Sequence, residues 1–131
     1  MKILEEVKNI LKQKPMIKLA IVYGSFAQGK EKPDSDLDLA VAGDRVLTPD
    51  EKVDIVNLIS SKIGREVDLI DLNEATGTVV KQAVETGVVL IKHDVDLLAR
   101  ILSRIVTDEE DFQKTRRKLM KSRRKKAFDV A

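Results

Sequence analysis

The sequence predicts an α/β fold, with a small mixed β-sheet flanked by helices, and three observations support this prediction. Short apolar runs of strand length alternate with stretches in which apolar residues recur every three or four positions. Glycine and proline fall between these segments. The 131 residues, 43% of them hydrophobic, suffice for one hydrophobic core. We therefore expect a single domain over residues 1–131, with its core at about 17–92 and a C-terminal helical, basic, partner-docking segment at about 94–131.

The predicted helices have clear periodicity or clear end signals. Apolar positions repeat at helical spacing over residues 3–12. Thr48-Pro-Asp-Glu51 combines an N-cap, a proline at the first helical position and a capping box, and Gly64 marks the end of that helix. Its expected buried stripe is Val53, Val56, Ile59 and Ile63. A third helix is expected from Asn73 or Thr76 to about 85, and a fourth from Asp94 onward.

Four apolar runs predict the strands, at residues 17–23, 37–41, 66–72 and 88–92. The first run is apolar at nearly every position, which is typical of a central strand that is buried on both faces. Helices and strands alternate through most of the chain, so the helices are expected to pack against the sheet.

The chemistry is concentrated around Gly24-Ser25 and Asp36-Leu-Asp38. Residues two apart on a strand point to the same face, so Asp36 and Asp38 are expected to project together. Paired carboxylates repel each other and favour a bound cation, and oxygen ligands without histidine or cysteine suit Mg²⁺, which commonly binds phosphates too. Gly24 permits close approach of a ligand, and Ser25 offers a hydroxyl and an amide at an expected helix N-terminus. These residues predict a site for a nucleoside triphosphate and Mg²⁺.

The motif Tyr-Gly-Ser-Phe-Ala-Gln-Gly at 23–29, followed by Pro-Asp-Ser-Asp-Leu-Asp-Leu at 33–39, resembles the nucleotidyltransferase superfamily. Over residues 17–92 the chain looks most like the minimal nucleotidyltransferases, the antitoxin halves of HEPN/MNT toxin–antitoxin pairs. The resemblance implies a nucleotidyltransferase-like fold with catalytic, metal-binding Asp36 and Asp38 and nucleotide-binding Gly24 and Ser25. It also implies a third catalytic and metal-binding carboxylate on a neighbouring strand, for which Asp68 is the candidate.

Alternatives remain at several of these positions. Glu66 shares the expected face of Asp68, whereas Asp71 is three residues on and is expected to face the other way. Gln28 departs from the family, which often has arginine there, so the phosphate charge would have to be met by Lys30 or Lys32 unless these are merely solvated. The single histidine, His93, is assigned no chemistry.

Composition excludes several other classes of function. The chain lacks cysteine, which rules out disulfides and thiolate metal sites, and it shows neither a signal peptide nor an 18-residue apolar run. We therefore expect a cytoplasmic protein that does not enter a membrane. Nine of its 24 basic residues fall within 114–126, a segment without acids that suits docking on an acidic protein or on RNA phosphates. With four aromatic residues and no reader motif, direct nucleic-acid binding is not expected.

The resemblance implies transfer of AMP from ATP, with Mg²⁺ as cofactor, to a tyrosine of a HEPN ribonuclease toxin, together with a hetero-oligomer of the two proteins. Two alternatives remain open: a nucleotidyltransferase acting on a small molecule or an RNA end, and a non-catalytic module that neutralises a toxin by binding alone.

Overall fold

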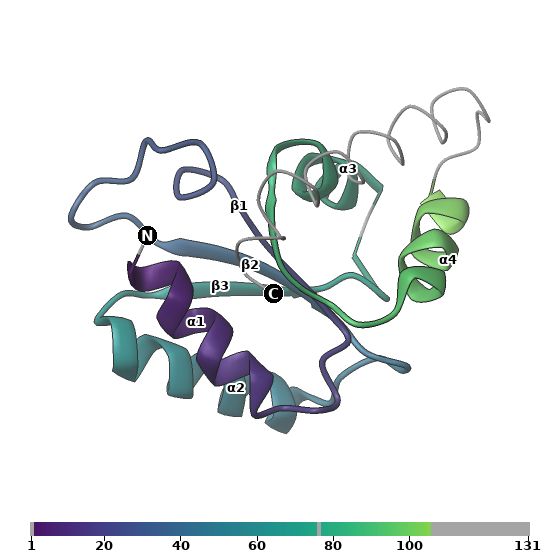
Figure 1. The fold of residues 1–131 in the computed structure, drawn as a ribbon, viewed down its shortest axis with the longest axis horizontal. Coiled ribbons are helices and arrows are strands. Elements are labelled where there is room, and N and C mark those ends of the chain that lie inside the picture. The colour runs from purple at the N-terminus through teal and green to yellow at the C-terminus, as the bar shows by residue number, and fades with distance from the viewer. Residues whose placement is uncertain (1, 76, 106–131) are drawn as a thin grey trace.

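The computed structural model describes residues 2–75 and 77–105. This part of the chain alternates helices and strands around one sheet, as Figure 1 shows. The elements are α1 (Lys2–Lys12), β1 (Leu19–Tyr23), β2 (Leu37–Ala42), α2 (Pro49–Ile63), β3 (Val67–Asp71), α3 (Gly77–Thr86), β4 (Val88–Lys92) and α4 (Val95–Ile105).

The sheet is mixed and has the strand order β3-β2-β1-β4. The strand β1 pairs antiparallel with both β2 and β4, and β2 pairs parallel with β3. All five residues of β1 are buried, as the unbroken apolar run at its position predicted. The α/β prediction is therefore confirmed, with β1 as a central strand.

Each face of the sheet is covered by two helices (Figure 1). On one face, Val7 and Leu11 of α1 and Ile55 and Ile59 of α2 pack against alternate strand residues such as Val22. On the opposite face, side chains of α3 and α4 pack against the intervening strand residues, which include Leu19, Ile21, Ala40 and Ala42. The alternation of side chains along each strand thus divides the core into two layers.

The start and end of α2 follow the local sequence signals. Thr48 accepts a hydrogen bond from the Glu51 amide, and the Glu51 carboxylate accepts one from the Thr48 amide, so the predicted capping box is present. Gly64 ends the helix in the left-handed conformation. The expected position of Val53 in the buried stripe was wrong, because it lies two residues, or about 200° around the helix, from Ile55, which faces the sheet.

The last described helix begins at the predicted place, since the Asp94 carboxylate accepts a hydrogen bond from the Leu97 amide. The basic segment 114–126, and most of the predicted C-terminal docking segment, lie outside the described residues. Within the described ranges, the helices are too short or too polar to cross a membrane.

Candidate functional site

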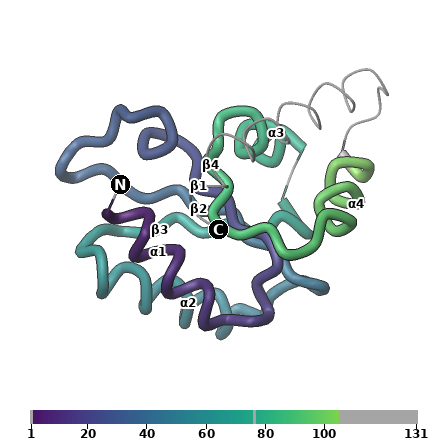
Figure 2. The backbone as a smooth tube through the Cα atoms, in the orientation of Figure 1, coloured from purple at the N-terminus to yellow at the C-terminus, as the bar shows by residue number. Residues whose placement is uncertain are grey.

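The predicted site residues lie at one end of the sheet. Because β1 runs antiparallel to β2, and β2 parallel to β3, the end of β1 lies beside the beginnings of the other two strands. Tyr23 and Asp38 are direct neighbours in the β1–β2 pair, and Asp38 and Asp68 are direct neighbours in the β2–β3 pair. These three side chains therefore lie in a row across three strands. The loop between β1 and β2 extends from the same end, away from α4 (Figure 2).

This row lies on the face of the sheet that α3 and α4 cover. Asp38 alternates with Ala40 on β2, and Asp68 alternates with Ile70 on β3, and both apolar residues belong to the layer beneath these helices. At the end of the strands where the acids lie, however, Asp38 is half-buried and Asp68 is exposed. The carboxylates are thus accessible to a ligand while their backbone is fixed by the sheet.

The position of Asp36 differs from the expectation. Strand β2 begins at Leu37, so Asp36 lies one residue before it and is exposed. Its charge nevertheless acts on the same group: burial, and then the negative charges of Asp68 and Asp36, raise the pKa of Asp38 above its ordinary value. The three carboxylates therefore interact electrostatically.

The acids do not form a closed ligand set in this structure. Between residues 2 and 105, with residue 76 left aside, no three acidic or histidine side chains converge closely enough to hold a metal ion by themselves. The donor set still fits Mg²⁺, because it offers only oxygen atoms and because a cation between the carboxylates would relieve the repulsion recorded at Asp38.

Tyr23 is a packing residue at the inner end of the row. It is 7% exposed and belongs to the core layer under α3 and α4. Burial, together with the charges of Asp38 and Asp68, raises the pKa of Tyr23 to about 12. The phenol therefore stays neutral at physiological pH beside the two carboxylates.

Gly24 makes the closest backbone approach to the acids. Its φ is +73°, a left-handed value that favours glycine, and a β-carbon built on it would overlap Asp38 Oδ2 and lie 3.1 Å from Asp38 Cγ. Hydrogen in place of a side chain at residue 24 is therefore what allows the carboxylate of Asp38 to lie against the turn.

The helix expected after Ser25 is absent, since residues 24–29 form turns instead. The amide of Gln28 donates to the carbonyls of Gly24 and Ser25, and the amide of Lys30 donates to that of Ser25. Gly29, with a φ of +69°, ends this single turn before it extends into a helix. The expectation of a helix N-terminus at Ser25 was therefore wrong, because Ser25 lies in a single turn and no helix follows it.

The loop residues considered as phosphate ligands are solvated. Gln28, Lys30 and Lys32 are exposed, as is the single histidine, His93. No arginine stands at position 28 to meet a phosphate, and the two lysines are the loop cations closest to it in the sequence.

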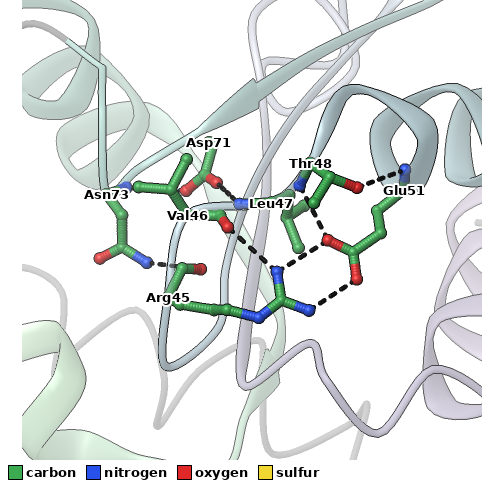
Figure 3. Close-up of polar contacts among 7 residues, drawn as sticks. All are labelled: Arg45, Val46, Leu47, Thr48, Glu51, Asp71 and Asn73. Atoms are coloured by element: carbon green, nitrogen blue, oxygen red, sulfur yellow. Dashed lines mark hydrogen bonds and ion pairs between the residues drawn. The ribbon is translucent and has the colours of Figure 1, made fainter.

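Asp71 is excluded from this site by its position on β3. It is 2% exposed, and its carboxylate accepts hydrogen bonds from the amides of Leu47 (2.7 Å) and Asn73 (2.9 Å), as Figure 3 shows for Leu47. It thus joins the loop after β2 to the end of β3, away from Asp68, as the spacing predicted. Asn73, one of two predicted caps of α3, instead donates to the carbonyl of Gly43, and the other, Thr76, lies outside the described residues.

The contacts of Arg65, which follows the α2 cap Gly64, were not predicted from the sequence. Its guanidinium donates to the carbonyls of Lys32 and Ser35 in the β1–β2 loop and lies over the ring of Phe26. No local pattern signals these contacts, because they join segments about 30 to 40 residues apart. Glu66, the alternative to Asp68, is exposed and precedes β3.

Comparison with known proteins finds a matching family model and named relatives. The family model described as "Polymerase beta, Nucleotidyltransferase" matches residues 5–96. The provisionally named protein adenylyltransferase MJ1217 of Methanocaldococcus jannaschii is 30% identical over 89 residues, covering 68% of this chain and 91% of that protein. Protein adenylyltransferase MntA of Shewanella oneidensis is 30% identical over 73 residues, covering 56% of this chain and 52% of that protein.

Solved structures share the fold. A toxin–antitoxin crystal structure with AMP-PNP superposes with a TM-score of 0.67 at 24% identity, covering 89% of this chain and 95% of that one. A structure of tri-AMPylated Shewanella oneidensis HEPN toxin in complex with MNT antitoxin gives a TM-score of 0.62 at 20% identity, with 91% and 93% covered. The chain belongs to the polymerase beta nucleotidyltransferase family and is an enzyme of that family, similar to proteins named protein adenylyltransferases.

Proposed function

We propose that this enzyme transfers AMP from ATP to a tyrosine hydroxyl of a partner HEPN ribonuclease and thereby acts as its antitoxin. The observation that carries the proposal is the placement of Asp36, Asp38 and Asp68 at one end of the sheet, against the turn at Gly24. The names of the relatives support the reaction, and the structure of an AMPylated HEPN toxin bound to an MNT antitoxin supports the kind of acceptor.

In this proposal the three aspartates hold Mg²⁺ and the turn at Gly24-Ser25 binds the triphosphate. Asp38 has the central part, because it lies between Asp68 on the next strand and the Gly24 backbone. When bound, Mg²⁺ would neutralise charge on the phosphate oxygens and on the carboxylates. Gly24 leaves room for the phosphates, and the amide and hydroxyl of Ser25 donate to them.

The reaction forms one P–O bond and breaks another. The oxygen of the acceptor hydroxyl attacks the α-phosphorus of ATP in line with the leaving group. The bond from that phosphorus to the β-phosphate oxygen breaks, and pyrophosphate leaves with its electron pair. The hydroxyl proton is released beside Asp68, whose exposed position on β3 leaves an approach for an acceptor.

The acceptor must bring its own binding surface. The described residues form one sheet with its covering helices, and no second domain stands among them in which a small acceptor would be enclosed. A folded protein that presents a tyrosine to the open end of the sheet meets this requirement. The setting that we propose is the cytoplasm, where ATP, Mg²⁺ and a ribonuclease toxin occur together.

The test uses the full chain, Mg²⁺, ATP and a HEPN ribonuclease as the acceptor. We expect the intact mass of the HEPN protein to rise by one or more adenylyl groups, and peptide mapping to place them on tyrosine. The combined variant Asp36→Ala with Asp38→Ala should reduce the transfer rate at least about 100-fold, because it removes two of three metal ligands. The control, Asp44→Ala with Asp96→Ala, removes two exposed aspartates outside the site and should leave the rate unchanged.

Two outcomes would contradict the proposal. If the double site variant still neutralised the toxin fully and no AMP transfer were detected with the wild type, the protein would act by binding alone. If adenylyl groups appeared on RNA ends or on a small molecule but never on protein, the reaction would stand and the acceptor would be wrong.

A further inference from the structure

Arg65 connects the candidate site to the opposite layer of the protein. It lies in the short connection between Gly64, which ends α2, and β3. Its Nη1 donates hydrogen bonds to the carbonyls of Lys32, at 2.7 Å, and Ser35, at 3.2 Å. Its guanidinium carbon lies 5.0 Å from the centroid of the Phe26 ring. One side chain thus contacts the β1–β2 loop at three positions.

Two of these contacts adjoin predicted ligand residues. Phe26 directly follows Ser25, and Ser35 directly precedes Asp36. Phe26 is 3% exposed and packs in the layer beneath α1 and α2, so the turn is anchored there under the guanidinium. Arg65 therefore acts on both ends of the loop, next to the phosphate-binding turn and next to the first aspartate.

The loop has little else to hold its second half. Lys32, Pro33 and Asp34 are exposed, and the bonds within this part are local ones between Lys32 and Ser35. The Lys30 amide, which donates to the Ser25 carbonyl, ties only the first half to the turn. Asp36 precedes β2 and so lies outside the strand ladder. Asp36 is therefore held between the Ser35 carbonyl, to which Arg65 donates, and Leu37, whose amide donates to the carbonyl of Glu66.

The chemistry of arginine suits this role better than that of lysine. A planar guanidinium donates hydrogen bonds in its plane while its face lies on an aromatic ring. A lysine ammonium is a compact charge without such a plane, so it would satisfy one carbonyl or approach the ring but would not reproduce all three contacts.

We propose that Arg65 is a positioning residue that holds Ser25 and Asp36 in the arrangement required to bind Mg²⁺·ATP. This inference rests on the proposed function, because it takes the nucleotide and the metal from it. Arg65 itself touches neither the row of aspartates nor the turn amides in this structure, and it acts through Phe26, Lys32 and Ser35.

The test measures nucleotide binding by the full chain without any acceptor. With a non-hydrolysable ATP analogue and Mg²⁺ in calorimetry, Arg65→Ala should weaken binding about tenfold, since it removes two hydrogen bonds and a cation–π contact. Arg65→Lys should fall between this variant and the wild type. In the nucleotide- and metal-free protein, amide hydrogen exchange over residues 28–36 should be faster in Arg65→Ala, a readout that does not depend on the loaded enzyme.

Arg45→Ala is the matched control. Arg45 also uses its guanidinium in surface contacts, with the Glu51 carboxylate and the carbonyl of Val46, but it lies beyond the opposite end of β2. Its loss should lower thermal stability and leave both nucleotide binding and exchange over 28–36 unchanged.

Unchanged binding or unchanged exchange over 28–36 in Arg65→Ala would overturn the inference, as would equal weakening of binding by Arg45→Ala. Because the wild type would still bind Mg²⁺·ATP in each of these cases, such results would not contradict the proposed function. Absence of Mg²⁺·ATP binding in the wild type would instead overturn the proposed function, and with it the role of Arg65.

Discussion

Replacing Gly24 by alanine tests whether the turn and Asp38 form one site. The new methyl group would lie 3.1 Å from Asp38 Cγ and would overlap the Oδ2 oxygen of that carboxylate. The backbone at Gly24 also has a φ of +73°, which an L-residue rarely adopts. The substitution therefore has two effects, a local strain in the turn and a displacement of a predicted metal ligand.

The two effects differ in size and in what they change. The left-handed backbone costs on the order of 1–2 kcal/mol with a side chain present, which lowers the melting temperature by roughly 4–8 °C for a chain of this length. To reach ordinary van der Waals separation, the carboxylate must move by about 1 Å, and a misplacement of that size reduces a catalytic rate about 100-fold. The carboxylate of Asp38 lies at the end of a side chain that can rotate, so we expect this carboxylate to move and the protein to stay folded.

Two other glycines separate these effects. Gly29 and Gly64 both have a φ of +69°, and nothing lies within 4 Å of a β-carbon built on either of them. Gly29→Ala and Gly64→Ala should therefore show the same loss of thermal stability as Gly24→Ala, because they introduce the same backbone strain. Neither should lower the adenylyl-transfer rate about 100-fold.

The assay compares the melting temperature of each variant with its initial transfer rate, measured well below the transition. If the three variants share one melting temperature and only Gly24→Ala loses adenylyl-transfer rate, the result supports a turn that packs directly against Asp38. Equal rates in the three variants would refute this reasoning, since the methyl group would then have displaced nothing that the reaction uses.

Three further predictions concern Asp38 and Asp71. Asp38→Asn removes a charge that its acidic neighbours repel, so calorimetry should show a higher melting temperature in the absence of metal. The variant should also lose the stabilisation by Mg²⁺·ATP, which for the wild type is about 2.7 kcal/mol at a ligand concentration of 100 times the Kd. A lower metal-free melting temperature would contradict this prediction. The pKa of Asp38 is raised above 3.8, so the folded protein binds this proton more tightly than the unfolded chain does. The contribution of Asp38 to the free energy of unfolding should therefore increase as the pH falls through the raised pKa, while Mg²⁺·ATP binding should weaken over the same range. Binding that did not depend on pH in this range would count against Asp38 as a ligand. Asp71→Ala leaves the amides of Leu47 and Asn73 without their acceptor, so the free energy of unfolding should fall by about 3 kcal/mol, while adenylyl transfer is retained below the unfolding transition. Loss of adenylyl transfer in the folded variant would show that Asp71 does more than join two segments.

The sequence predicted well those features that neighbouring residues determine. The start and end of α2 follow from the capping box at Thr48 and from Gly64, and the span of β4 follows from a bounded apolar run. The burial of β1 follows from its lack of polar residues. The face shared by Asp38 and Asp68 follows from the alternation of side chains once β2 and β3 pair in parallel.

Features that depend on packing between distant segments were not predictable in this way. The phase of α2, which leaves Val53 at the surface, is set by its contact with the sheet. The β1–β2 loop extends through Asp36, which therefore lies before β2, and the turn after Ser25 closes at Gly29 instead of continuing as a helix. The contacts of Arg65 join the α2–β3 connection to the loop, and no periodicity in either segment signals them.

The proposed function depends most on a divalent cation bound among the three aspartates at the end of the sheet. The most direct measurement is a crystal structure of the full chain with Mn²⁺ and a non-hydrolysable ATP analogue, in which anomalous scattering locates the metal. We expect a metal peak ligated by Asp36, Asp38 and Asp68, with the triphosphate against the turn at Gly24 and Ser25. A metal bound to other groups, or nucleotide bound while the three carboxylates remain without metal, would contradict it.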